Sequence, residues 1–169
     1  MRVEIQSRFE NEDRHQPHCM RSDADLNESR SERGRFKGPI LVAGAIIESG
    51  SRVLIARRCV QESDSFAGRW EFPGGTVKYG EDPRDCLVRE IKEELNCEIR
   101  VDSILDVSSF VYPDRLHFVV LFFKCRLSQG EPEPKRHDEV KWVRLSDLEE
   151  YEFLAADRPI IERLTKHAR

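Results

Sequence analysis

The chain has 169 residues and a net charge of −4, with 36% charged and 38% hydrophobic residues. This length suits one domain with a substantial core, and the slightly acidic balance argues against a dedicated nucleic-acid-binding protein, which usually carries a basic surplus. No apolar run is long enough to span a bilayer, and the N-terminus lacks the apolar segment of a signal peptide. The sequence therefore predicts a cytoplasmic protein that does not insert into membranes. The five cysteines form no CxxC pair, so a zinc site is not expected.

Residues 1–37 differ in composition from the rest of the chain. They are rich in Arg, Glu, Asp, Ser and His, and their apolar residues are scattered. Such a segment buries too little apolar surface to offset the entropy lost on ordering. We expect a disordered polar tail over residues 1–37 and one domain over residues 38–169. A regulatory or partner-binding tail is the alternative.

Strand-like segments and turns follow from residue 38 onward. An apolar run at residues 40–47 and a second run at residues 52–57 flank a polar turn at 48–51, which indicates a hairpin. Further elements are predicted as one or two short strands at 98–111, strands at 116–127 and 140–145, a capping box opening a helical turn at 146–149, and a helix at about 158–166. Strands interspersed with helices indicate a mixed α/β domain.

A further helix is predicted to begin at Asp82-Pro83. Aspartate can cap a helix, and the missing N–H of proline has no consequence at the first helical position. One flank of this helix is apolar and is expected to face the sheet; it consists of Leu87, Val88, Ile91 and Leu95.

Three glutamates, Glu90, Glu93 and Glu94, lie on another flank of the predicted helix. They share it because residues at i, i+3 and i+4 are neighbours at about 100° of rotation per residue. Like charges so close repel one another, which favours a cation between them, and oxygen ligands suit Mg²⁺ bridging carboxylates and substrate phosphates. The alternative is a charge-rich solvent-exposed helix. The glycine loop at Gly74-Gly75 and the position of Glu81 favour a metal-dependent phosphoanhydride site.

Residues 75–97 resemble the Nudix box. The pattern is a glycine, five residues, Glu81, seven residues, and then Arg89-Glu90, an apolar residue, any residue, and Glu93-Glu94. Asn96 stands where the family has glycine, and asparagine tolerates the left-handed conformation that ends such a helix.

The resemblance extends over roughly residues 39–164. Residues 70–75, 112–115 and 156–159 are similar to stretches of the MutT-type branch. The resemblance implies an α/β/α sandwich around a mixed sheet. It also implies Mg²⁺-dependent hydrolysis of a nucleoside triphosphate to monophosphate and pyrophosphate, with Mn²⁺ as a substitute metal. Substrates of the branch include oxidised guanine nucleotides, and close relatives act on cytosine nucleotides.

The same resemblance implies roles for the box residues. Glu93 and Glu94 are expected to bind metal, Glu90 to bind metal or act as the base, and the main-chain carbonyl of Gly74 to complete the shell. Arg89 and Glu81 are expected to form an orienting ion pair, with a plain surface salt bridge as the alternative. Glu139 is the candidate for a further downstream metal ligand, although many relatives carry that carboxylate where this chain has Arg136. His137 is expected at the surface.

Three more residues are expected to bind substrate. Arg58 matches an arginine near the phosphates, with a solvated strand end as the alternative. Asp157 matches the position that contacts the base, where a carboxylate can accept a hydrogen bond from an amino group of guanine or cytosine; the alternative is a cap for the last helix. Phe72 is expected either to stack on the base or to be a core aromatic.

Other functions remain open from the sequence. They are a Nudix hydrolase for another nucleoside diphosphate-linked substrate, a non-catalytic nucleotide-binding module, and an enzyme acting on 5′-triphosphate RNA, which the lack of a basic surplus disfavours. The chain is expected to be a monomer or a homodimer.

Overall fold

The computed structural model describes residues 38–61, 66–113 and 116–167. The elements in chain order are β1 (Ile40–Ser49), β2 (Arg52–Arg57), β3 (Trp70–Glu71), β4 (Gly74–Thr76), α2 (Pro83–Leu95), β5 (Glu98–Val111), β6 (His117–Gln129), β7 (Glu139–Arg144), the 3-10 turns η1 (Leu145–Glu150) and η2 (Ala155–Asp157), and α3 (Arg158–His167). The predicted tail at residues 1–37, and positions 114 and 115 of the MutT-like stretch at 112–115, lie outside the described residues. The predicted tail therefore stays a prediction.

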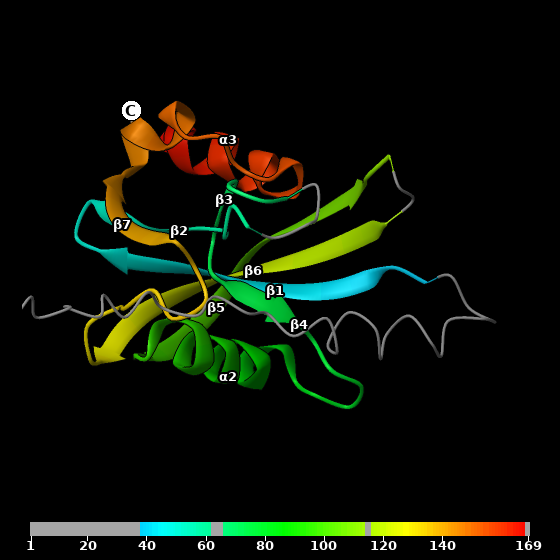
Figure 1. Ribbon diagram of the computed structural model, residues 1–169, viewed down its shortest axis with the longest axis horizontal. Coiled ribbons are helices and arrows are strands. Elements are labelled where there is room, and N and C mark those ends of the chain that lie inside the picture. Colours follow the sequence, from blue (N-terminus) through cyan, green and yellow to red (C-terminus); the bar gives the residue numbers. More distant parts are fainter. Residues whose placement is uncertain (1–37, 62–65, 114–115, 168–169) are drawn as a thin grey trace, which may run out of the picture.

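The strands form one mixed sheet, as predicted. Its main order is β3-β2-β1-β6-β5, with β4 paired to β1 and β7 paired to β2. β1 runs parallel to β6, and the other pairs are antiparallel. Figure 1 shows the sheet with β5 and β6 extending together to one side.

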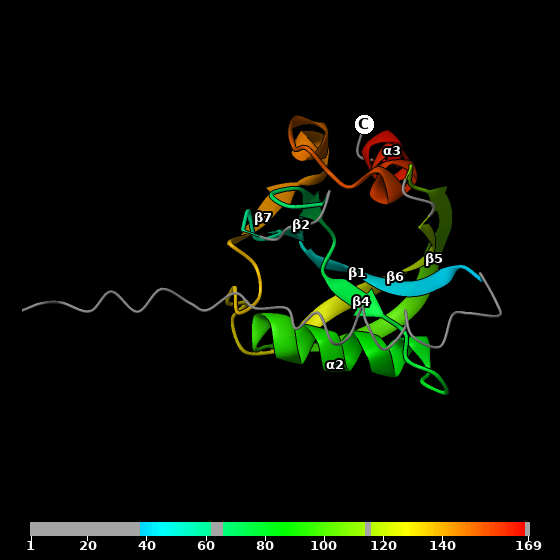
Figure 2. The same ribbon diagram turned by 45° about the vertical axis from the view of Figure 1, so that its right-hand side comes forward.

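Helices cover both faces of this sheet. In Figure 2, α2 lies beneath the sheet and α3 lies above it, together with the segment that carries the 3-10 turns. Alternate residues of β1 explain the two layers: Ala43, Ala45 and Ile47 belong to the buried cluster that includes the apolar residues of α2, whereas Ile46 belongs to the cluster that includes Ile160 of α3. The predicted α/β/α sandwich around a mixed sheet is confirmed.

Local signals predicted some elements better than others. The β1–β2 hairpin is present, with Gly50 at φ 60° in its turn. Residues 98–111 form one bulged strand. The prediction of a capping box at residues 146–149 is wrong. The helical turn there is the 3-10 segment η1, whose cap position is Arg144. The Ser146 hydroxyl donates instead to Asp147 Oδ1 at 2.6 Å. Among the described residues, no helix is long and apolar enough to cross a bilayer.

Candidate active site

The turn at Pro73–Gly75 is fixed by its pairing with β1. The Pro73 carbonyl accepts from Ala45 N at 2.8 Å, and Gly74 is the register partner of Gly44. A Cβ at Gly74 would lie 2.1 Å from the backbone oxygen of Ala43, a distance that no side chain tolerates. Only glycine therefore lets the turn lie this close to β1.

Helix α2 begins and ends where the sequence predicts. Asp82 is the N-cap and accepts from Arg84 N at 2.8 Å, and Asn96 ends the helix in the left-handed region at φ 53°. Val88 was expected to face the sheet, but it is 45% exposed. It lies about 100° of rotation beyond Leu87, at the margin of the buried arc.

The three box glutamates differ in their exposure. Glu94 is only 2% exposed. It follows Leu87 by seven residues, which is about 20° short of two full turns, so it lies within the buried arc of α2. Glu90 lies over the turn, because a Cβ at Gly75 would be 2.5 Å from the Glu90 carboxyl carbon. Glu93 is the most open, with a side chain that is 38% exposed.

Arg89 connects the glutamates to the loop ahead of the helix. Its Nε donates to Glu81 Oε1 at 2.8 Å and its Nη2 to Glu81 Oε2 at 3.0 Å, while Nη1 donates to Glu90 at 2.5 Å and lies 3.8 Å from Glu93. Glu81 also accepts from Lys78 N at 2.9 Å. The hydrogen bonds from Arg89, opposed by partial burial, lower the pKa of Glu81 to about 2. The expected Glu81–Arg89 ion pair is therefore present, with the bidentate geometry that holds both groups in place.

Downstream of α2, the structure separates the two candidate positions for a further carboxylate. Glu139 lies on β7, where it forms ion pairs with Arg57 at 3.4 Å and Lys141 at 2.8 Å. Arg136 instead reaches the carboxylate flank of α2, with its Nη2 3.4 Å from Glu93 Oε2. A metal-binding role for Glu139 stays a prediction.

A second cluster of charged residues lies near the Pro73–Gly75 turn, on the side of strands β2 and β3. Arg58 and Glu71 are both largely buried and form an ion pair at 3.4 Å, and His137 Nε2 lies 3.0 Å from the other Glu71 oxygen. The side chain of His137 is 0% exposed, so its expected surface location is wrong. The solvated strand end considered for Arg58 does not fit its burial.

Asp157 belongs to the same region. Its Oδ2 accepts from the backbone N–H of Phe72 at 3.2 Å, across 85 residues of sequence. Burial and the charge of Glu71 raise the pKa of Asp157 well above its usual value, against the opposing effect of that hydrogen bond. The carboxylate thus binds the main chain next to the Pro73–Gly75 turn.

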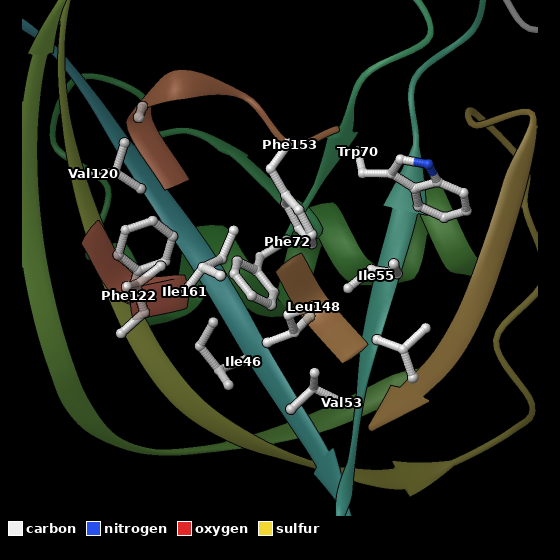
Figure 3. Close-up of a cluster of buried hydrophobic side chains, with 13 residues drawn as sticks. Ile46, Val53, Ile55, Trp70, Phe72, Val120, Phe122, Leu148, Phe153 and Ile161 are labelled. Carbon is white, nitrogen blue, oxygen red and sulfur yellow. The ribbon is translucent and has the colours of Figure 1, made fainter. Parts of the chain in front are cut away.

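The ring of Phe72 lies in the apolar core. Its centroid is 5.3 Å from that of Phe153 and 6.1 Å from that of Phe122. Figure 3 shows Phe72 beneath Phe153 among the buried side chains. This position supports the core-aromatic alternative, and a stacking role stays a prediction.

Comparison with known proteins identifies the family. The NUDIX domain model matches residues 38–164. The chain belongs to the Nudix family. A Nudix relative, the putative 8-oxo-dGTP diphosphatase 2 of Mycobacterium tuberculosis (strain ATCC 25618 / H37Rv), is 35% identical over 127 residues, which cover 75% of this chain and 88% of the relative. The CTP pyrophosphohydrolase of Escherichia coli (strain K12) is 32% identical over 128 residues, covering 73% and 89%.

A solved structure agrees with this assignment. The MutT NUDIX hydrolase from Burkholderia pseudomallei has a TM-score of 0.66 and 30% identity, over 75% of this chain and 98% of that protein. The protein is therefore a MutT-like Nudix hydrolase, an enzyme that acts on phosphoanhydride bonds.

Nudix hydrolases generally use divalent metal ions, and the donor chemistry of α2 fits such an ion. Glu90, Glu93 and Glu94 offer only oxygen donors from one side of one helix, beside the Gly74-Gly75 turn. Within the described ranges, however, no three His, Cys, Asp or Glu side chains are arranged to hold a metal as they stand. Oxygens of Glu90 and Glu93 lie close to arginine guanidinium groups instead.

Sequence reasoning missed Glu71 as a site residue. Glu71 joins Arg58 and His137, and its charge acts on Asp157. It lies within the MutT-like stretch at residues 70–75, immediately before Phe72. That stretch was the available signal, but nothing in it indicates that this carboxylate is buried among charged partners.

Proposed function

We propose that this Nudix hydrolase cleaves a nucleoside triphosphate to the monophosphate and pyrophosphate with Mg²⁺, which Mn²⁺ can replace. The observation that carries the proposal is the position of the box carboxylates. Glu90 lies directly over Gly75, and Glu94 is buried in the adjacent helix face. Carboxylates splayed into solvent would have argued for a charged surface helix.

Glu93 and Glu94 are the proposed metal ligands, with the Gly74 carbonyl as a further donor and Glu90 as a further ligand or as the base. A divalent ion held there would neutralise phosphate charge and act as a Lewis acid. Arg89 orients Glu90 and Glu93 and is itself fixed by Glu81. The site thus aligns fixed charges with a phosphate chain before reaction.

Arg58, Phe72 and Asp157 are proposed to bind the nucleotide. The buried Arg58–Glu71 pair places a guanidinium on the strand side of the turn, and Asp157 offers a carboxyl group beside the backbone of Phe72. A carboxyl group recognises an amino group of a base. The names of the relatives mention 8-oxo-dGTP and CTP, so oxidised guanine and cytosine nucleotides are the proposed substrate classes.

The test is a nucleotide panel assayed with Mg²⁺ for monophosphate and pyrophosphate together. It includes canonical, oxidised and methylated triphosphates, sugar nucleotides and dinucleotides. Turnover of a triphosphate with stoichiometric pyrophosphate is expected. Turnover confined to sugar nucleotides or dinucleotides would contradict the proposal and assign another Nudix substrate.

A matched pair of variants tests whether activity depends on the carboxylate flank of α2. Glu94→Gln is expected to reduce kcat by several orders of magnitude, roughly 10³-fold or more, because it removes the buried anionic donor. Glu98→Gln removes the same charge from an exposed glutamate that pairs with Lys92 at 3.4 Å, and it should leave kcat unchanged. Circular dichroism of both variants checks that they fold. Near-normal turnover by Glu94→Gln would exclude its metal role.

A further inference from the structure

Arg136 reaches the carboxylate flank from a backbone segment that is tied down on both sides. The connection between β6 and β7 is bound to the end of α2 by Lys135 N, which donates to the Glu94 carbonyl at 2.9 Å. Just beyond Arg136, Asp138 N donates to the Arg57 carbonyl at 2.9 Å, and Asp138 Oδ2 accepts from Val60 N at 3.0 Å. The backbone therefore presents the Arg136 side chain to Glu93 in a defined direction.

Glu93 lies near two guanidinium groups. Arg89 is 3.8 Å from Glu93 and is bound to Glu81 and Glu90. Arg136 is 3.4 Å from Glu93, and the side chains of Arg136 and Glu93 are both about one third exposed. Because water reaches both partners, the Arg136–Glu93 ion pair is weak enough to exchange with another charged group.

We propose that Arg136 is a substrate-contacting residue that exchanges between Glu93 and the phosphate chain of the substrate. Glu93 releases the guanidinium when it takes up a divalent cation, since both positive groups compete for the same carboxylate. The released Arg136 then donates to phosphate oxygens, for which its planar fork is well suited. This inference rests on the proposed function and adds to it a residue outside the box.

The exchange of Arg136 between Glu93 and phosphate should affect cation binding and polyphosphate binding in opposite directions. Without substrate, Arg136 competes with the cation and weakens metal binding at Glu93. With metal present, the same side chain adds affinity for a polyphosphate. A single substitution should therefore strengthen one equilibrium and weaken the other, which a merely structural ion pair would not do.

The first experiment measures Mn²⁺ binding to the metal-free full chain by electron paramagnetic resonance, without nucleotide. Arg136→Gln is expected to bind Mn²⁺ roughly 2- to 5-fold more tightly than wild type, the effect of one exposed pair. The control is Arg126→Gln, which removes the same charge from a guanidinium bound to Asp102 at 2.8 Å on the sheet. Equal Mn²⁺ affinity for the two variants would overturn the exchange.

The second experiment measures binding of inorganic tripolyphosphate in saturating Mn²⁺ by titration calorimetry. Arg136→Gln should weaken binding about 10-fold and Arg136→Lys less, because lysine keeps the charge but not the fork. Arg126→Gln should match wild type. Unchanged tripolyphosphate affinity in Arg136→Gln would overturn the proposed contact. Neither measurement depends on turnover, so an enzyme that hydrolyses no triphosphate would refute the proposed function while leaving this test intact.

Discussion

Glu90 lies so close to Gly75 that a methyl group on the glycine would come within 2.5 Å of the Glu90 carboxyl carbon and 2.8 Å of its Oε1. The contact joins the turn after β3 to the carboxylate flank of α2. Gly74, next to it, is more crowded, and its nearest neighbour is the backbone oxygen of Ala43, 2.1 Å from the position that a methyl group would take. Adjacent glycines thus have different roles, since a side chain can move aside and a strand cannot.

Alanine at these two positions should therefore separate activity from stability. Gly75→Ala is expected to displace Glu90 and reduce kcat on the order of 100-fold, the effect of misplacing a reacting group by about 1 Å. Its free energy of unfolding should fall by less than about 1 kcal/mol, because Glu90 is flexible. Gly74→Ala should lose roughly 3 kcal/mol or more. Urea unfolding and turnover of both variants are the measurements, and equal losses of stability would contradict this assignment.

The Glu81–Arg89 pair should make stability depend on pH in acid. The pKa of Glu81 is lowered from 4.5 to about 2. Since the folded pKa is depressed, the stabilisation is fully present above pH 4.5 and is lost as the pH falls toward 2. Glu81→Gln should therefore lower the free energy of unfolding on the order of 2 kcal/mol near neutral pH, after allowance for partial solvent screening.

Urea titrations of wild type and Glu81→Gln at several pH values check this effect. The difference between the two proteins should be constant from neutral pH down to about pH 5 and should shrink toward about pH 3. A difference that stays constant into the acid range would show that the charge of Glu81 is not its source. Asp82→Asn, which keeps an N-cap, is the neighbouring control.

Local chemistry made α2 predictable. Asp82 and Asn96 mark its ends by their own conformational preferences, and the 3.6-residue repeat fixes which side chains share a flank. The Glu81–Arg89 ion pair could also be predicted, because its two residues are only eight positions apart, on either side of the start of α2. Such features depend on near neighbours in sequence, which is the information that a single sequence contains.

The strand side of the site was less predictable for a physical reason. Glu71 and His137 are 66 residues apart, and they meet only because β3 and β7 both pair with β2. The register of those pairs depends on the whole sheet rather than on either segment. The sequence alone led us to expect His137 at the surface, whereas the fold buries its side chain.

Asp157 should reduce stability at neutral pH. Its pKa is raised by burial first and by the charge of Glu71 second. Because the folded pKa exceeds the unfolded value, stability is lost as the pH rises from the usual range of an aspartate toward the folded pKa. Asp157→Asn keeps an oxygen acceptor for Phe72 N without the titratable group. It should be at least as stable as wild type at neutral pH.

Two comparisons test the prediction for Asp157. The advantage of Asp157→Asn should disappear below about pH 4, where both states of the wild type bind the proton. Asp157→Ala removes the acceptor and leaves a buried N–H unsatisfied, so it should lose about 1–3 kcal/mol. A loss in Asp157→Asn as large as in Asp157→Ala would show that the carboxyl proton, not the acceptor, is the essential feature.

His137 should stabilise the fold through its contact with Glu71. Its Nε2 lies 3.0 Å from Glu71 Oε1, whereas its Nδ1 has no hydrogen-bond partner among the described residues. His137→Leu fills a similar volume but deprives a largely buried carboxylate of a partner, which should lower the free energy of unfolding by about 1–3 kcal/mol. His137→Gln can place an amide N–H near the former Nε2 and should recover part of that loss. Urea unfolding of wild type and the two variants measures both effects. If His137→Gln is no more stable than His137→Leu, the fold requires the packing of the ring rather than its hydrogen bond to Glu71.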